Sequence, residues 1–416
     1  MKTTSHESGQ ALVLIVFAIV GLVGLTGLAV DGGLAYSDRR NAQNAADTAA
    51  LGAALAHTRG RDVVSTAMAA ALRGGYNDDN VTNTVTVTVD DLPSGDCPFM
   101  AIGKDITVQI TSHVKTSFAP VVGVRTVTNT VRATSRACDP YIGPMFPGDA
   151  IIALAHSGIG FDAAGTPDWS IVGGGIFSNS SGDPSARCKG AAGVTTPSLT
   201  TVGDPLMRCS GTIGTTTPGA TQLDYSDYSD LLPRIPACDG AATRIGPFWI
   251  AQPGADGSRV TFNGGDMRFG QGLFCVTNSP GPYHGQITGT GVTFYLMPSN
   301  FTIDFNGGGS LTATAPLPGT SEYAGVLMFS APQLVNGELI QTQSIDLRGN
   351  GTGDVTGSII VPSADVTMFG NSNSSGYHTQ VIAYHVDTGG NANININYQA
   401  DLAYQTFHQA WLTLLR

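Results

Sequence analysis

The feature that most constrains this chain is an uncharged apolar run, residues 11–30, which directly follows a short polar head. As an α-helix rising about 1.5 Å per residue, the run spans about 30 Å, the hydrocarbon thickness of a bilayer. Thirteen of its residues are Leu, Ile, Val or Phe, and each favours insertion by roughly 0.3 to 0.6 kcal/mol. We therefore expect a transmembrane helix at 11–30, with residues 1–10 as a cytoplasmic head.

A cleaved secretory signal is the competing interpretation of this run. Signal peptides have a basic start, an apolar core of about 7–15 residues and a small-residue cleavage site. Here the start offers only Lys2 and His6, the core is longer, and Gly33-Leu34-Ala35 matches such a site poorly. The chain also continues without proline into an Ala-rich stretch of high helix propensity that reaches Ala56. These features predict a retained anchor.

The orientation in the membrane rests on two opposing features. The positive-inside rule would keep Arg39 and Arg40, just past the run, in the cytoplasm, and Lys2 is a weak counterweight. Six cysteines and a long hydroxyl-rich region downstream favour the opposite side, because disulfides form in oxidising compartments. We expect the N-terminus inside and the bulk of the chain outside the cytoplasm.

Composition predicts β structure for most of the exported region. Only 12% of the 416 residues are charged, 54 are Gly, and Lys and Glu are almost missing. Such a chain suits strands joined by tight turns, with a surface of hydroxyls and amides. A net charge of −11 argues against a nucleic-acid partner, whose phosphates would repel it. An apolar fraction of 42% is sufficient to fill a core.

The six cysteines are even in number, widely spaced and never arranged as CxxC. This spacing gives little support to zinc or thioredoxin-like chemistry, and we expect neither a metal nor a cofactor. Sequence alone allows 15 pairings of six cysteines. We expect the nearest neighbours to pair: Cys97 with Cys138, Cys188 with Cys209, and Cys238 with Cys275.

Residues 31–140 have the pattern of a helix-plus-sheet module. A helical stretch at Asp62 to Arg73 ends at Gly74-Gly75, a C-cap signal. Residues 81–89, 106–118 and 127–134 alternate apolar with polar side chains, as half-buried strands do. A long N-terminal helix, half in lipid, packed on a small antiparallel sheet is the general plan of a pilin.

Three sequence pieces carry a family resemblance. Ser8-Gly9-Gln10-Ala11, the segment GLAVDGG at 27–33 and the segment QNAADTAAL at 43–51 resemble the TadG-like N-terminal region of the TadE/TadG Flp/Tad pilus-assembly proteins. The resemblance covers about residues 8–56. It implies a bacterial envelope protein of the tight-adherence machinery, anchored in the inner membrane, with its C-terminal part outside the cytoplasm.

The chain departs from the family and from true type IV pilins in two ways. Some relatives carry a von Willebrand A domain with a DxSxS metal motif, which Asp168-Trp169-Ser170-Ile171-Val172 does not preserve. The glutamate that type IV pilins use in polymerisation is missing from the apolar run, since Glu7 lies before it.

Four residues of the anchor are candidate membrane-helix packing sites. Gly21, Gly24 and Gly27 form a stripe of small residues, which lets helices approach closely in lipid. The stripe would then dimerise or dock on a pilus-assembly partner, although glycine is also common in membrane helices. Asp31 stands at the outer edge of the run, where it caps, pairs or simply lies at the interface.

The pattern of residues 141–416 predicts a large exported all-β domain. Many short apolar runs alternate with Gly, Asn, Ser and Asp turns, which favours a β-solenoid or β-helix, and a sandwich stays open because no strict repeat period is found. A polysaccharide-cleaving β-helix would need clustered carboxylates. Candidates by residue type are Asp162, Asp168, Asp304, Asp346, Asp354, Asp365 and Asp387, although Asp is also a common turn former.

The sequence as a whole predicts an α+β protein: a transmembrane helix (11–30), a pilin-like module (31–140) and an all-β domain (141–416). We expect no enzymatic activity. The expected role is that of a pilus-assembly scaffold, minor pilin or surface adhesin whose partners are the bilayer and Tad/Flp proteins or pilus subunits. The alternative is a membrane-anchored protein that binds or cleaves surface glycans, and self-assembly into a filament is a third possibility.

Overall fold

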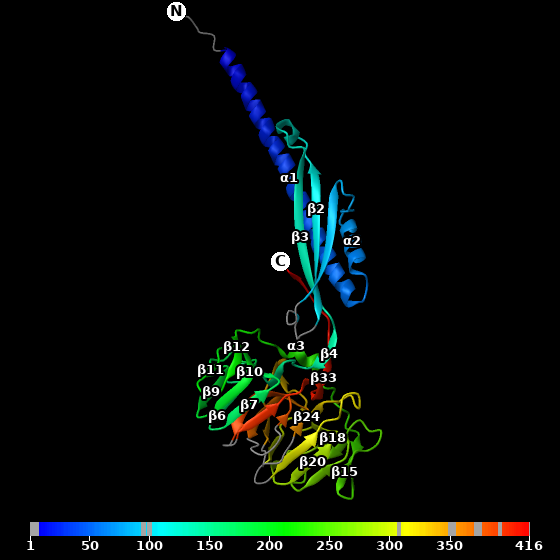
Figure 1. Ribbon diagram of the computed structural model, residues 1–416, viewed down its shortest axis with the longest axis vertical. Coiled ribbons are helices and arrows are strands. Elements are labelled where there is room, and N and C mark those ends of the chain that lie inside the picture. The colour runs from blue at the N-terminus through cyan, green and yellow to red at the C-terminus, as the bar shows by residue number, and fades with distance from the viewer. Residues whose placement is uncertain are drawn as a thin grey trace, which may run out of the picture. The chain divides into compact units, whose positions relative to one another are not determined.

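The computed structural model describes residues 8–92, 97, 102–305, 309–347, 355–369, 377–389 and 393–415 (Figure 1). Most of the expected head (residues 1–7) and Asp354 lie outside these residues. The chain forms two compact units. The helix–sheet unit comprises residues 1–141 with 409–416, and the β unit comprises residues 142–408. The last eight residues, which we expected in the all-β domain, therefore belong to the helix–sheet unit.

One continuous helix, α1 (Ser8–Thr58), joins the apolar run to the Ala-rich stretch. Helix α2 (Val63–Arg73) follows and begins where the Asp62 side chain accepts a hydrogen bond from the Ser65 N–H at 2.6 Å. Gly74 is its C-cap, as the sequence predicted. The face of α1 that is buried from residue 42 onward is made of alanines: Ala42, Ala45, Ala46, Ala49, Ala50, Ala53 and Ala54.

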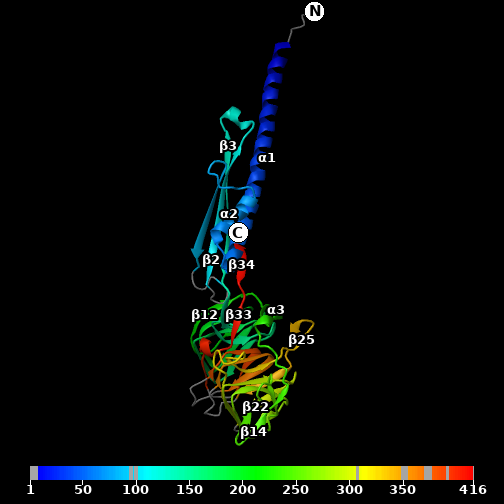
Figure 2. The ribbon, with the colours of Figure 1, turned by 90° about the vertical axis from the view of Figure 1, so that its right-hand side faces the viewer.

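Four antiparallel strands form the sheet of this unit, in the order β1 (Asn83–Asp91), β2 (Gly103–Lys115), β3 (Thr126–Cys138) and β34 (Trp411–Leu415). A 3-10 turn, η2 (Ala119–Val122), lies between β2 and β3. Inward side chains such as Ile106, Val108 and Ile110 are fully buried against the alanine face of α1. Figure 2 shows α1 running along β2 and β3. The small antiparallel sheet that alternation predicted is confirmed.

The β unit consists mainly of short parallel strands that stack in three ladders. Ladder 1 contains, in spatial order, β13 (Gly240–Ala241), β16 (Ser258–Val260), β18 (Gly272–Val276), β21 (Val292–Leu296), β24 (Val326–Ser330), β29 (Ser358–Phe369), β31 (Val381–Gly389), β5 (Asp149–Ala153), β8 (Gly175–Ser178), β10 (Gly193–Thr201) and β12 (Ile213–Pro218).

Ladder 2 contains β19 (Gly281–Tyr283), β22 (Thr302–Phe305), β27 (Gln343–Leu347), the second halves of β29 and β31, β6 (Phe161–Gly165), β9 (Ala186–Gly190) and β11 (Leu206–Met207). Ladder 3 contains β14 (Thr243–Ile245), which is antiparallel to β15, then β15 (Phe248–Ile250), β17 (Met267–Phe269), β20 (Gln286–Thr290), β23 (Ser310–Thr314), β28 (Val355–Thr356), β30 (Tyr377–His378), β32 (Ile394–Asn397), β7 (Asp168–Val172) and β10.

The remaining elements of the β unit connect or cover the ladders. They are the paired strands β4 (Tyr141–Pro144) and β33 (Gln405–His408), the hairpin β25 (Leu334–Val335) with β26 (Glu338–Leu339), α3 (Tyr225–Tyr228), η3 (Ser229–Leu231) and η4 (Ala400–Leu402).

The chain enters ladder 1 in its middle rather than at an end. From β5 it proceeds outward to β12, then residues 219–239 lead to β13 at the opposite end, and the following strands return to β31, where Val381 pairs with Ile151 of β5. Stacked turns normally leave the two chain ends far apart. Because the chain enters in the middle, the first and last strands of the β unit, β4 and β33, pair with each other. This suits a β unit inserted in the chain between β3 and β34, which are themselves neighbours in one sheet.

Ladder 1 is buried on both of its faces. The inner column runs through residues from all parts of the ladder and joins a core shared with ladders 2 and 3: Phe274, Phe294, Met328, Ile359, Val381, Ile151, Ile176 and Leu199. The outer column is equally apolar: Cys275, Tyr295, Phe329, Ile360, Ile382, Ile152 and Phe177. Residues 219–239, which we call the strap, cover part of this outer column through Tyr228 and Cys238. The large all-β domain that composition predicted is confirmed.

The three disulfides are the nearest-neighbour pairs expected from the sequence. Cys97–Cys138 lies in the helix–sheet unit, at the end of β3. Cys188–Cys209 joins β9 to the segment after β11, and Cys238–Cys275 fixes the end of the strap to β18.

Candidate functional site

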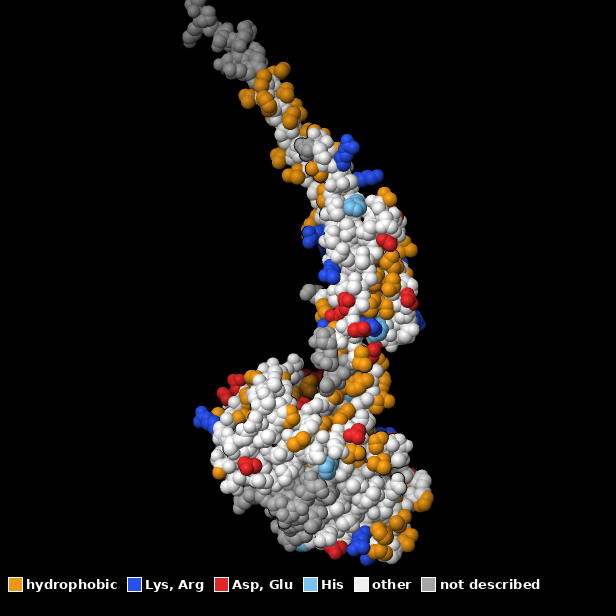
Figure 3. Space-filling model, viewed as in Figure 1, with side chains coloured by type: hydrophobic (Ala, Val, Ile, Leu, Met, Phe, Trp, Pro, Cys, Tyr) orange, Lys and Arg blue, Asp and Glu red, His pale blue; other side chains and the backbone are white. Residues whose placement is uncertain are grey.

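The apolar part of α1 carries the longest run of exposed large hydrophobic side chains among the described residues. Side chains from Leu12 to Leu28 are between 52 and 73% exposed wherever they are large and apolar, and Figure 3 shows hydrophobic side chains around this part of the helix. By length and composition α1 is the one described helix able to cross a membrane. Exposing so large an apolar surface to water is unfavourable, so this part of the helix is expected to lie in an apolar environment.

Asp31 fastens the turn between β2 and β3 to α1. Its Oδ1 accepts the N–H of Ser117 at 2.8 Å, and its Oδ2 accepts the N–H groups of Phe118 and Ala119 at 2.9 and 2.7 Å. Asp31 as a residue is 6% exposed. Hydrogen bonds to an ionised carboxylate favour that form, so the Ser117 N–H, with its two neighbours, holds the pKa of Asp31 below its ordinary value. Asp31 is thus a fastening point for a loop distant in sequence.

The turn itself is shaped by its own sequence. Pro120 stands in the first turn of η2, where its missing N–H is harmless. Gly123 ends η2 with a φ of 91°, a left-handed conformation that glycine adopts without strain. The N–H groups at the start of η2 have no partner within so short a helix, and Asp31 supplies one.

The three glycines of the apolar run differ in their surroundings. A Cβ atom on Gly27 would lie 2.6 Å from the Cβ of Phe118. The close contact between α1 and the turn is therefore possible because residue 27 has no side chain. Gly21 and Gly24 have no heavy atom of the described chain within 4 Å of such a Cβ. Among the described residues, therefore, Gly27 is the one member of the stripe that packs against another part of the chain. The packing of the stripe against a second helix stays a prediction.

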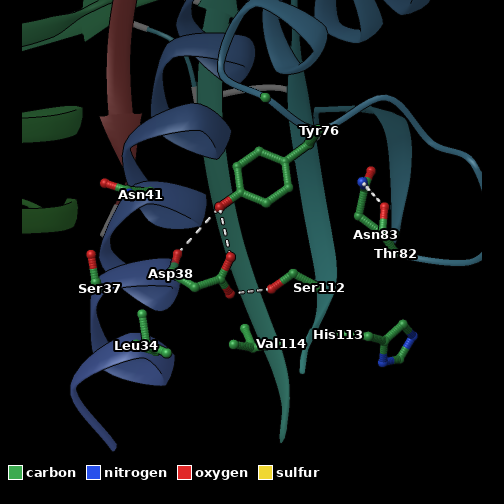
Figure 4. A pocket seen from close by; sticks show the side chains of 11 residues that line it. Leu34, Ser37, Asp38, Asn41, Tyr76, Thr82, Asn83, Ser112, His113 and Val114 are labelled. Carbon is green, nitrogen blue, oxygen red and sulfur yellow. Dashed lines mark hydrogen bonds between the residues drawn. The ribbon is translucent and has the colours of Figure 1, made fainter. Parts of the chain in front are cut away.

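Asp38 forms a second fastening point two turns further along α1 (Figure 4). Its carboxylate accepts hydrogen bonds from the Ser112 hydroxyl, from Asn129 Nδ2 at 2.7 Å and from the Tyr76 hydroxyl at 3.3 Å. Burial, together with the nearby charge of Asp38, raises the pKa of Tyr76 to about 12. Asp38, Tyr76 and Ser112 line a pocket of about 400 Å³ between α1 and the β1–β2 hairpin. Sequence reasoning did not single out Asp38.

Carboxylates gather on the outer face of ladder 2. Five residues on neighbouring strands stand in register, each paired with the next. Their order along the ladder is Asp304, Asp346, Thr367, Asp387 and Asp162. Neighbouring strands lie about 4.8 Å apart, so these side chains form a short column. Asp365 lies beside it, paired with His385. Asp168 does not join this group because it lies on ladder 3.

Two of these carboxylates have basic partners. Arg187 holds Asp162 with two hydrogen bonds, and His385 Nδ1 lies 2.8 Å from an oxygen of Asp365. Burial and the neighbouring charge of Asp162 raise the pKa of Asp387 to about 6. The described residues contain no group of His, Cys, Asp and Glu arranged to hold a metal ion.

An exposed apolar helix of membrane-spanning length, fused to a hydrophobically packed helix–sheet unit, is the arrangement expected of a protein with an N-terminal membrane anchor. The comparison with known families agrees with this class: residues 9–56 match the family described as putative Flp pilus-assembly TadE/G-like. No curated protein and no solved structure matches the chain. The family resemblance drawn from the sequence is confirmed for this N-terminal region.

Proposed function

We propose that this chain is a single-pass inner-membrane protein of the Tad/Flp pilus system, with its N-terminus in the cytoplasm. Its β unit acts outside the cytoplasm as an assembly scaffold, minor pilin or adhesin, and we assign it no catalysis. The observation that carries the proposal is the continuity of α1, whose exposed apolar part and buried alanine part belong to one helix fastened by Asp31.

The position of Asp31 supports retention of the anchor over cleavage. A signal peptidase cutting after Gly33-Leu34-Ala35 would remove Asp31 and with it the partner of three N–H groups in the turn. The N–H groups of this partly exposed turn would then be left to water, and the turn would lose its fixed position on α1. Cleavage would therefore discard a contact that the folded helix–sheet unit makes.

The proposed mechanism is mechanical. A load on the β unit passes into the helix–sheet unit through two adjacent strands, because β3 leads into the β unit and β34 leads out of it. The disulfide Cys97–Cys138 fixes the end of β3. The sheet passes the load to α1 through the alanine core, Asp31 and Asp38. For the β unit we infer a β-helix, since its strands pair in parallel and in regular succession.

The test is the location of the full chain in cells that have or lack the Tad machinery. We expect an uncleaved protein that stays with the inner membrane after alkaline carbonate washing, with its β unit accessible to protease in spheroplasts. If its abundance or location depends on the machinery, a pilus role is supported. A mature chain that begins after Ala35 and leaves the membrane would refute the proposal.

A second candidate function is favoured by the carboxylate column of ladder 2. Asp387 is poised to carry a proton near pH 6, while its neighbour Asp162 is held by Arg187, and glycan-cleaving enzymes use such unlike carboxylates in pairs. The candidate is a membrane-anchored protein that binds or cleaves glycans. The test measures oligosaccharide binding and the release of reducing ends by the wild type and by Asp387→Asn. The absence of both signals in both proteins would exclude this candidate function.

A further inference from the structure

The turn between β2 and β3 lies beside the membrane segment of α1 rather than beyond it. Gly27, which Phe118 contacts, precedes the end of the apolar run at residue 30 by three residues, or about 4.5 Å along the helix. Figure 1 shows this turn next to α1. If α1 spans the bilayer as proposed above, Phe118 lies at or below the level where the hydrocarbon begins.

The turn carries apolar side chains that the described chain leaves exposed or covers only in part. Val121 is 91% exposed, Val124 46% and Phe118 43%, and Pro120 is also exposed. They continue the exposed surface that Leu28 and Val30 present on α1 at the same level. A single surface therefore runs from the membrane helix onto the turn.

Basic residues border this apolar turn on its side away from the membrane segment. Lys115 ends β2 and Arg125 precedes β3, and both are exposed. The Thr116 N–H bonds to the Arg125 carbonyl, which keeps these two residues together at the base of the turn. Arg39 and Arg40 of α1 are exposed two turns beyond Asp31. None of the four has an ion pair among the described residues. Such cations match the anionic headgroups of a bilayer.

We propose that residues 117–124 form a second membrane contact, inserted in the interfacial layer beside α1. Phe118, Val121 and Val124 contact the acyl chains near the headgroups, and Lys115 and Arg125 bind lipid phosphates. Amphipathic structures lying on membranes bury their apolar faces by about 5 to 10 Å, which agrees with the depth of Phe118. Asp31 sets this depth because it fixes the turn to α1 at one point. The inference rests on the proposed membrane anchoring.

Two contacts at one level define an orientation that a single helix does not. A lone membrane helix can rotate about its axis and tilt, whereas a helix with an inserted turn presents one side to the lipid at a fixed depth. The helix–sheet unit would then stand on the membrane in one orientation, with the sheet directed outward.

The experiment uses the full chain in liposomes of phosphatidylethanolamine and phosphatidylglycerol, with or without acyl chains brominated near the headgroup. Val121→Trp places a fluorophore on the turn, and Ile102→Trp is the matched control. Ile102 is 77% exposed and precedes β2 at the end opposite the turn, about 40 Å away along the strand. The signal is the difference from the wild type, which has its own tryptophans.

We expect brominated lipid to quench most of the added emission of Val121→Trp and to leave that of Ile102→Trp unchanged. Asp31→Asn should weaken the quenching at position 121 while the protein still floats with the vesicles. Lys115→Gln with Arg125→Gln should lower the quenching in proportion to the phosphatidylglycerol content.

The outcomes separate this inference from the proposed function. A protein that does not float with vesicles refutes the anchor itself. A protein that floats, with the emission of Trp at 121 unquenched, refutes the inserted turn and leaves the anchor in place. Unquenched but blue-shifted emission that depends on protein concentration would show the turn covered by a second copy, which also overturns the inference.

Discussion

Two adjacent residues of β5 test whether the strap and its neighbours cover the outer face of ladder 1. Ile151 points to the inner core and Ile152 to the outer one, and both are fully buried. In a sheet with one wet face, only the inward residue would matter. Here the outer column packs against residues such as Tyr228, so Ile152 should matter as much as Ile151.

The magnitude follows from the buried groups that each change removes. Ile→Ala deletes three carbon atoms, at roughly 0.8 kcal/mol for each buried methylene-sized group. With the cavity left behind, each change should lower the free energy of unfolding by about 2 to 5 kcal/mol. Val172→Ala is the control, because Val172 is 59% exposed and exposed substitutions usually stay within about 0.5 kcal/mol.

The assay is denaturant unfolding of the full chain in detergent, followed by tryptophan fluorescence. Trp169 is a suitable probe: it is 1% exposed in ladder 3, and its indole N–H donates to the Thr388 hydroxyl at 2.7 Å. We expect Ile151→Ala and Ile152→Ala to lower the midpoint by similar amounts. If Ile152→Ala behaves like the Val172→Ala control while Ile151→Ala is strongly destabilising, the outer face is not covered and the reasoning is wrong.

Three further changes test other contacts. Removing the Cys238–Cys275 disulfide, whose cysteines are 37 residues apart, should destabilise the β unit by about 4 kcal/mol in a chain-entropy model and should make the strap sensitive to protease. An unchanged digestion pattern would show that the strap is held by other contacts. Gly27→Val should displace the turn and lower the thermal midpoint of the helix–sheet unit, whereas Gly24→Val should leave it unchanged, and equal midpoints would disprove the close contact. Burial raises the pKa of Asp149 to about 7, so its contribution to stability is complete below the unfolded value near 4 and is lost as the pH rises through 7. Asp149→Asn should flatten this decline in denaturation midpoints measured from pH 4 to 8, and an identical decline in both proteins would count against it.

Much of the helix–sheet unit was predictable because its signals are local. The apolar run, the Ala-rich stretch and the alternation of β1, β2 and β3 each lie within a few turns or one strand of chain. Periodicity of this kind reports which face is buried, and it identified the small sheet. The strand β34 escaped this reasoning, since its partner β3 precedes it by more than 270 residues.

The disulfides and the carboxylates show the same division. The expected cysteine pairs are present. They could be predicted from the sequence because each bridge joins residues no more than 41 apart. The sequence named the aspartates only by type, and it could not say that Asp162 and Asp387, 225 residues apart, would stand in register. That register exists because the chain enters the ladders in the middle and returns to β31 from the far end.

By itself, then, the sequence determined that this protein has a membrane-length apolar helix continuing into a helix–sheet module, and a large β region rich in turns. These properties follow from hydrophobicity and short-range periodicity, which depend only on nearby residues. Tertiary structure decided what Asp31 and Asp38 hold, how the strap covers ladder 1 and which carboxylates become neighbours. Each of these is a contact between distant segments, and such contacts are specified by the packing of the whole unit rather than by any local pattern.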